Sequence, residues 1–233
     1  PAPSMMVGEI NEMWIRQDWL DNLGLEVPRT WDEMAAVAEA FVTQDPDGNG
    51  EADTIGILGP GNSNHINAIG GNQFGLDPLF CSFQSYPQYW LQDEDGTVKY
   101  GSIQPETRTA LEKIQKLYTD KLIDPEMLVR NNCQEAVLSG KVGIFFQPWY
   151  AGYTMSEAIL AGEADWRAYF TPLSEDGNYY THMPAPTTNY VVVSKSCKNP
   201  EAAFKIINYL IANEQQWVAD GISSTELAAS NFY

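Results

Sequence analysis

The spacing of apolar residues predicts two long amphipathic helices. Thr30 and Glu33 form a capping box, the pattern that often starts a helix, and Pro105 opens the second helix. Apolar residues then recur at intervals of three and four, which places them on one face of a helix. They are Met34, Val37, Ala38 and Phe41 in the first helix and Leu111, Ile114, Leu117 and Tyr118 in the second. Each of these faces is expected to pack against a core.

Shorter helices are expected at four other places. One covers residues 18–23 and ends at Gly24, and another covers residues 134–138. Thr154 and Glu157 form a second capping box. A helix also follows Asn199, with Pro200 in its favoured first position. The core face of that last helix is predicted to consist of Ala203, Ile206, Ile207 and Leu210.

The strand prediction rests on one continuous apolar run and several weaker ones. Residues 142–146 are apolar throughout, which is typical of a strand buried on both faces. Shorter strands are expected at residues 14–16, 166–173 and 190–193. Residues 93–96 form an acidic turn between two aromatic segments, which predicts a hairpin.

An acidic loop follows the first long helix. Side-chain oxygens fall at positions one, three, five and nine of a calcium loop, Gly50 takes position six, and position seven offers a backbone carbonyl. The predicted calcium ligands are Asp45, Asp47, Asn49, Glu51 through its carbonyl, and Asp53. Position twelve is Gly56, so the bidentate glutamate of an EF-hand is missing, and a structural Ca²⁺ site weaker than a sensor site is expected. The alternative is a hydrated Asp/Gly/Asn turn.

Aromatic residues follow the buried strand. Gln147, Trp149, Tyr150 and Tyr153 come where this strand opens into a loop, and ligands of α/β folds bind at such strand ends. A flat ring can stack on the apolar face of a sugar, while the amide of Gln147 hydrogen-bonds its hydroxyls. These four residues are therefore predicted to bind ligand. The alternative is that the rings belong to the core.

Composition narrows the classes of function. The 233 residues contain 31 acidic and 13 basic side chains, a net charge of -18, which argues against nucleic acid and anionic membrane surfaces as partners. No run is long and apolar enough to cross a membrane. The three cysteines, Cys81, Cys133 and Cys197, form no CxxC pair, so no zinc site and no disulfide framework are indicated. One disulfide is possible, but the spacing predicts no pairing. His65 and His182 have no patterned partner, and no catalytic motif occurs, although a pair of carboxylates remains open as a glycosidase site.

Several stretches, in this order, carry a resemblance to a known family. They are residues 14–25, residues 27–33, the acidic loop, residues 117–126 with the sequence LYTDKLIDPE, residues 140–143, and residues 198–203. Together they resemble the extracellular solute-binding proteins of ATP-binding-cassette (ABC) importers, family 1, which are similar to maltose-binding protein. Within that family the chain looks most like the larger lipoproteins of gut Firmicutes.

The resemblance implies an α/β fold of the periplasmic-binding-protein type II. Residues 1–185 would form mainly the C-terminal lobe, and residues 186–233 would hold part of the hinge, the return segment toward the N-terminal lobe and the tail. The N-terminal lobe, the signal peptide and the lipid anchor are expected outside this chain. The family also implies calcium in the acidic loop, although Thr54 stands where members often carry a glutamate ligand, and a ligand platform at Trp149 and Tyr150.

The expected function is therefore capture of a carbohydrate, an oligosaccharide, outside the cell. The protein would be a monomeric cell-surface lipoprotein that passes its solute to a membrane permease, without enzymatic activity. The alternative from another class is a secreted carbohydrate-active enzyme or a binding module, and a third is a surface domain that uses calcium for stability.

Overall fold

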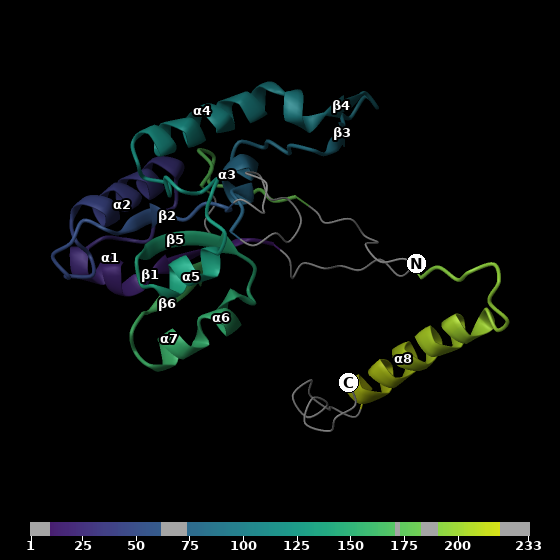
Figure 1. The fold of residues 1–233 in the computed structure, drawn as a ribbon. Helices are drawn as coiled ribbons and strands as arrows, with labels where there is room; N and C mark the ends of the chain where they lie inside the picture. The colour runs from purple at the N-terminus through teal and green to yellow at the C-terminus, as the bar shows by residue number, and fades with distance from the viewer. Residues whose placement is uncertain (1–9, 62–73, 171–172, 183–190, 220–233) are drawn as a thin grey trace. The chain divides into compact units, whose positions relative to one another are not determined.

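The structure is a computed structural model that describes residues 10–61, 74–170, 173–182 and 191–219 (Figure 1). His65 lies outside these ranges. Residues 10–182 belong to one compact unit, and residues 191–219 belong to a second. In the part that is described, no helix combines the length and the apolar character needed to cross a membrane.

A mixed four-stranded sheet forms the centre of the larger unit. Its strands, in spatial order, are β2 (Ile55–Ile57), β5 (Val142–Gln147), β1 (Glu12–Arg16) and β6 (Trp166–Tyr169). β2 runs parallel to β5, whereas β1 runs antiparallel to both β5 and β6. All six residues of β5 are buried, as its apolar run predicted. Helices cover both faces of the sheet, so the predicted α/β fold is confirmed.

Two hydrophobic clusters lie on opposite faces of this sheet. Figure 1 shows α2 (Trp31–Thr43) and α4 (Pro105–Thr119) on one side and α5 (Cys133–Leu138), α6 (Ala151–Thr154) and α7 (Ser156–Leu160) on the other. Ile15 of β1 belongs to the first cluster. Trp14 belongs to the second, where its ring stacks on Phe145 with centroids 6.2 Å apart. Neighbouring strand residues thus point to opposite faces.

The described part of the larger unit also contains three smaller helices and a hairpin. The helices are α1 (Gln17–Leu23), α3 (Asp77–Cys81) and the 3₁₀ helix η2 (Gly101–Ile103), and the predicted hairpin is β3 (Trp90–Gln92) with β4 (Val98–Tyr100). α1 ends at Gly24, whose φ of +66° is the left-handed conformation that glycine adopts without strain.

The start of α2 confirms the capping box. Thr30 Oγ1 accepts a hydrogen bond from the backbone N–H of Glu33 at 3.2 Å, and Glu33 Oε2 accepts one from the backbone N–H of Arg29 at 2.7 Å. Two N–H groups without helical partners are thereby satisfied. The four apolar residues predicted for this helix are all buried.

The buried face of α4 differs from the prediction. Ile114 and Leu117 are buried as expected, but Leu111 and Tyr118 are exposed at 46% and 41%. Thr107 and Ala110 are buried instead. Thr107 is polar, yet its hydroxyl is satisfied by the carbonyl of Gly101 at 2.8 Å. A hydroxyl with an internal partner can replace an apolar side chain on a buried face, and a search for apolar residues alone overlooks it.

Three further local predictions differ from the structure. Thr154 does not cap the next helix, because its Oγ1 donates to the carbonyl of Ala151 within α6, and α7 begins without a side-chain cap. Residues 191–193 form no strand, and Tyr190 lies outside the described residues. The strand predicted over residues 166–173 is shorter, since β6 ends at Tyr169.

The second unit contains α8 (Glu201–Ala219), which begins close to the predicted Asn199. The backbone N–H of Ala202 donates to the carbonyl of Asn199 at 3.1 Å. Within this unit, Ile206 and Leu210 of the predicted core face are both more than half exposed. The helix was therefore predicted correctly, and the described residues of its own unit do not cover these two side chains.

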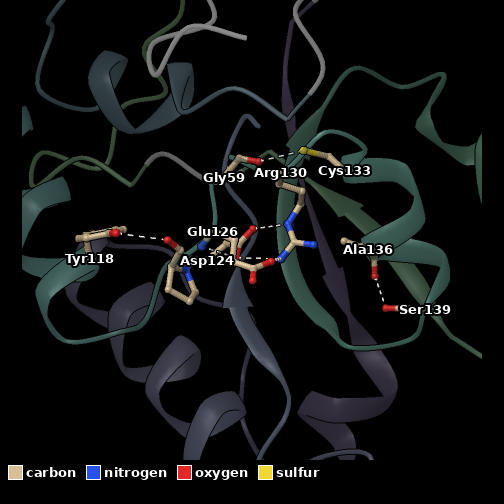
Figure 2. Close-up of polar contacts among 9 residues, drawn as sticks. Gly59, Tyr118, Asp124, Glu126, Arg130, Cys133, Ala136 and Ser139 are labelled. Carbon is tan, nitrogen blue, oxygen red and sulfur yellow. Dashed lines mark hydrogen bonds and ion pairs between the residues drawn. The ribbon is translucent and has the colours of Figure 1, made fainter. Parts of the chain in front are cut away.

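A buried ion pair holds the connection between α4 and α5 against β2 (Figure 2). Asp124 is completely buried, and its carboxylate accepts hydrogen bonds from Arg130 Nε at 2.5 Å and Nη2 at 3.0 Å. The backbone N–H of Asp124 donates to the carbonyl of Ile57 at 2.8 Å. Glu126 Oε2 lies 3.2 Å from Arg130 Nη2. This network explains the physical role of the sequence LIDPE, which fixes one turn to the edge of the sheet.

Candidate functional site

The acidic loop has the local geometry of a turn built around side-chain oxygens. Gly48 and Gly50 have φ of +68° and +80°, a conformation that only glycine adopts easily. Asp45 accepts hydrogen bonds from the backbone N–H groups of Asn49 and Gly50 at 3.1 and 3.0 Å. The N–H of Glu51 donates to Asn49 Oδ1 at 2.6 Å. Donors of the chain itself thus hold the predicted ligands Asp45 and Asn49 in place.

The carboxylates of this loop lie close to one another and to a lysine. Asn49 Nδ2 donates to Asp47 Oδ2 at 3.0 Å and to Asp53 Oδ1 at 3.3 Å, so the amide bridges two carboxylates. Partial loss of hydration raises the pKa of Asp47, and the adjacent Asp45 raises it further. Lys141 Nζ lies 2.5 Å from Asp53 Oδ2, and this contact lowers the pKa of Asp53. A divalent cation would relieve the repulsion between Asp45 and Asp47 and would compete with Lys141 for Asp53.

Three aromatic side chains gather just beyond the end of β5. The ring centroid of Trp149 lies 6.1 Å from that of Tyr150 and 5.8 Å from that of Tyr153, both in edge-to-face arrangements. Trp149 and Tyr153 are exposed at 53% and 74%. Of the two rings for which the core was the alternative, Trp149 is therefore not a core side chain, while Tyr150 is partly buried. We refer to Trp149, Tyr150 and Tyr153 as the ring cluster.

Gln147, the fourth predicted ligand residue, is buried at the base of the ring cluster. Its backbone carbonyl accepts a hydrogen bond from Trp14 Nε1 at 3.0 Å. Its side-chain Oε1 is buried and has no hydrogen-bond partner in the structure. An unsatisfied buried acceptor costs about 1–3 kcal/mol, so such a group usually has a reason to be there.

Two polar residues before the apolar part of β1 were not indicated by any sequence pattern, and one of them lies opposite Gln147. Glu12 pairs with Gln147 across the antiparallel strands β1 and β5, which places both side chains on the same face of the sheet. Burial raises the pKa of Glu12. The preceding residue, Asn11, is buried, and neither its side-chain oxygen nor its nitrogen has a hydrogen-bond partner. The available signal was a polar pair directly before an apolar strand, which cannot be interpreted without knowing the strand that lies opposite.

The acidic loop and the ring cluster lie at opposite ends of one strand. Lys141, the partner of Asp53, directly precedes β5, and its carbonyl accepts a hydrogen bond from the backbone N–H of Ile55 at 2.7 Å. The ring cluster follows the last residue of the same strand. The predicted metal ligands and the predicted ligand-binding residues therefore form two separate groups, and a cation in the loop would act on the fold rather than touch a ligand at the rings.

The remaining candidates from the sequence have clear places. Cys81 and Cys133 are buried, Cys197 is exposed, and all three are unpaired, so the disulfide left open by the sequence is not formed. His182 has a partner that no pattern indicated, because its Nδ1 lies 2.8 Å from Oδ2 of the buried Asp77.

The sequence is similar to several known proteins. It is 35% identical to lipoprotein LipO of Bacillus subtilis over 135 residues, which are 57% of this chain and 25% of the relative. It is 32% identical over 146 residues to FusA of Streptococcus pneumoniae, a fructooligosaccharide ABC transporter substrate-binding protein, covering 60% and 26% of the two chains. The chain thus spans about a quarter of the length of these relatives.

Solved structures and the family match lead to one assignment. The structure of FusA in complex with kestose superposes with a TM-score of 0.57 at 25% identity, covering 76% of this chain and 35% of that one. A second structure to which the chain is similar is that of an EF-hand mutant of FusA. The predicted fold class is thereby confirmed as that of periplasmic-binding-protein-like (type II) sugar-binding proteins. Residues 8–217, nearly the whole chain, match the bacterial extracellular solute-binding proteins, and the chain belongs to this family.

Proposed function

We propose that this chain is part of the substrate-binding component of an ABC importer and contributes an oligosaccharide-binding surface at the end of β5. The observation that supports this most strongly is the ring cluster, in which two of three adjacent aromatic side chains are largely exposed directly after a buried strand. Exposed aromatic groups of this size are favourable platforms for the apolar faces of sugar rings. The pneumococcal relative, which binds kestose in its solved structure, adds support.

Each predicted ligand-binding residue has a distinct role in this proposal. Trp149 provides the stacking surface, and Tyr150 and Tyr153 hold its ring edge-to-face and extend the surface. Gln147 Oε1 accepts a hydrogen bond from a sugar hydroxyl that enters at the base of the rings, which would satisfy an acceptor that has no partner now. The net charge of -18 favours a neutral oligosaccharide over an acidic one.

The wider context of the function is part of the same proposal. Residues 1–185 contribute mainly the C-terminal lobe and residues 186–233 the return segment of a longer, monomeric protein. That protein works outside the cell as a surface lipoprotein, consistent with the name of the Bacillus relative, and delivers its solute unchanged to a membrane permease. The acidic loop binds a structural calcium ion, and the study of an EF-hand mutant of the pneumococcal relative supports this.

Trp149→Ala tests the binding surface. In the full-length protein, titration calorimetry with kestose is expected to show an affinity at least tenfold weaker than that of the unaltered protein, because a central aromatic contact is lost. Trp90→Ala is the matched control, since Trp90 is also an exposed tryptophan, at 72%, but lies on the β3–β4 hairpin. Chromatography of the kestose after incubation should return it intact.

Three outcomes would contradict the proposal. Equal loss of affinity in both tryptophan variants would show that the ring cluster has no special role. Preferential binding of an acidic oligogalacturonide over kestose would contradict the inference of a neutral solute, while release of monosaccharides would favour the enzyme alternative.

A further inference from the structure

Three buried side chains with nitrogen, sulfur and oxygen donor atoms meet at a place that neither predicted site includes. They are Asp77, Cys81 and His182, with exposed fractions of 2%, 1% and 6%. One donor atom from each lies within 4.8 Å of the other two, and among the described residues no other such trio of His, Cys or acidic side chains is found. We call these three residues the buried trio.

The fold brings the trio together from two distant segments. Asp77 and Cys81 are four residues apart on α3, so both side chains lie on the same face of this short helix. His182 arrives about a hundred residues later in the chain and approaches the same face. Cys81 Sγ lies 4.0 Å from Asp77 Oδ1, and His182 Nδ1 lies 2.8 Å from Asp77 Oδ2.

These separations are close to those between ligands of one tetrahedral metal ion. With usual zinc bond lengths, a tetrahedral site separates nitrogen from oxygen by about 3.3 Å and sulfur from oxygen by about 3.5 Å. The sulfur separation in the trio is measured to Asp77 Oδ1 and the nitrogen separation to Asp77 Oδ2, and each differs from the zinc value by roughly half an ångström. A rotation of the Asp77 carboxylate would bring one oxygen between the other two donors, and all three donor atoms already lie within 4.8 Å of one another.

The contacts among these donor atoms are incomplete. His182 Nδ1 lies 2.8 Å from Asp77 Oδ2 as an ion-pair contact but makes no hydrogen bond, and the thiol of Cys81 donates a long hydrogen bond, 4.0 Å, to Asp77 Oδ1. Burial raises the pKa of Asp77, which only His182 lowers, and it raises the pKa of Cys81 well above the usual range. A buried carboxylate is unfavourable unless positive charge and hydrogen bonds compensate it, and a metal ion would supply that charge to Asp77.

We propose that Asp77, Cys81 and His182 bind a divalent transition-metal ion, with Zn²⁺ as the best match. A thiol and an imidazole together favour zinc over calcium or magnesium, which prefer oxygen ligands alone. On binding, the thiol of Cys81 releases its proton to solvent and the sulfur becomes a thiolate ligand. Three protein ligands leave the fourth tetrahedral position for a water molecule.

Such an ion would join α3 to the last described residues of the larger unit. Tyr179, three residues before His182, donates a hydrogen bond to the carbonyl of Asn11 at 3.1 Å. The metal would thus fix the segment that already contacts the start of β1. The site is distinct from the acidic loop and does not depend on the proposed function, because it requires no sugar and no other part of a transporter.

Cobalt provides a direct test on the whole 233-residue chain. The protein is saturated with Ca²⁺, to occupy the acidic loop, and titrated with Co²⁺. We expect one Co²⁺ per chain, with a thiolate-to-cobalt charge-transfer absorption that Zn²⁺ removes. The absorption should vanish in Cys81→Ser and persist in Cys133→Ser, the control at the other buried thiol. His182→Gln should bind at least tenfold more weakly.

A measurement on the unaltered chain guards against variants that fail to fold. Zn²⁺ at about a hundred times its dissociation constant should raise the melting midpoint in Ca²⁺-saturated buffer by about 5–10 °C, because only the folded state binds it. No thiolate absorption and no rise of the midpoint would overturn the proposal and leave a buried Asp–His pair. An absorption that is lost in Cys133→Ser instead would also overturn it.

Discussion

The acidic loop and the buried trio are two sets of potential metal ligands that differ in how their residues are spaced along the sequence. The loop takes its donors from nine consecutive residues, and most of these are exposed. The trio takes its donors from positions 77, 81 and 182, and all are almost fully buried. In the loop, backbone N–H groups and an amide already satisfy the carboxylates. In the trio, His182 Nδ1 lies beside the Asp77 carboxylate but makes no hydrogen bond.

This difference shows what decides whether a site can be found from a sequence. A contiguous site leaves its spacing in the sequence, because the same few residues supply the ligands and the turn. An assembled site leaves no spacing between its parts, so His182 had no recognisable partner before the fold was known. The same difference predicts distinct responses to mutation, since an exposed carboxylate can exchange one partner for water and a buried carboxylate cannot.

The largest effect is expected where a buried carboxylate loses its only described cation. Arg130→Ala leaves Asp124 buried and unpaired, and we expect the free energy of unfolding to fall by about 3–5 kcal/mol. Urea unfolding of the purified chain measures this value. Arg108→Ala is the control, because Arg108 pairs with Glu112 on the exposed side of α4, where such a pair contributes about 0.5 kcal/mol or less. Similar losses in the two variants would show that burial does not set the strength of these pairs.

A smaller effect is expected from calcium in the acidic loop. At a hundred times its dissociation constant, Ca²⁺ should stabilise the chain by about 2.7 kcal/mol relative to metal-free protein, because the unfolded chain has no assembled site. Thermal unfolding with and without Ca²⁺ checks this. Asp47→Asn should remove most of the difference, whereas Glu94→Gln, which removes one charge from the β3–β4 turn, should keep it. An equal midpoint with and without Ca²⁺ would mean that the loop is only a hydrated turn.

The smallest effect concerns competition for one ligand of that loop. Lys141 forms an ion pair with the carboxylate of Asp53. Lys141→Ala should remove this competitor and strengthen calcium binding by up to about fivefold. Calorimetric titration with Ca²⁺ measures the change. Lys99→Ala, which breaks the equivalent exposed pair with Asp93 on the hairpin, should leave the affinity unchanged. Unchanged or weaker binding in Lys141→Ala would argue that Asp53 is not a calcium ligand.

Much of the fold could be predicted from local patterns. The capping box at Thr30, the end of α1 at Gly24 and the buried strand β5 depend on residues close in the sequence, and the structure confirms all three. Thr154 shows the limit of such patterns. Its hydroxyl donates a hydrogen bond to the carbonyl of Ala151 instead of capping the next helix. A local motif cannot show which of two nearby backbone groups the hydroxyl will bind.

The candidate ligand site was only partly visible for a related reason. Trp149, Tyr150 and Tyr153 lie within five residues, and the structure brings them together as expected. Glu12 is distant from Gln147 in the sequence and lies opposite it only through the antiparallel pairing of β1 with β5. Likewise, the exposed Leu111 on α4 could not be recognised, because the neighbouring elements determine which side of the helix is covered.

The hydrogen bond from Tyr179 to Asn11 has a mechanical consequence. It joins the residue directly before β1 to a residue near the end of the described part of the larger unit, so these two distant parts of the chain lie side by side. A force that pulls on either part would therefore be shared with the other through this bond. The residue after Asn11 is Glu12, which lies directly opposite Gln147 in the sheet, so a displacement at this bond would be transmitted to the strand pair that carries Gln147.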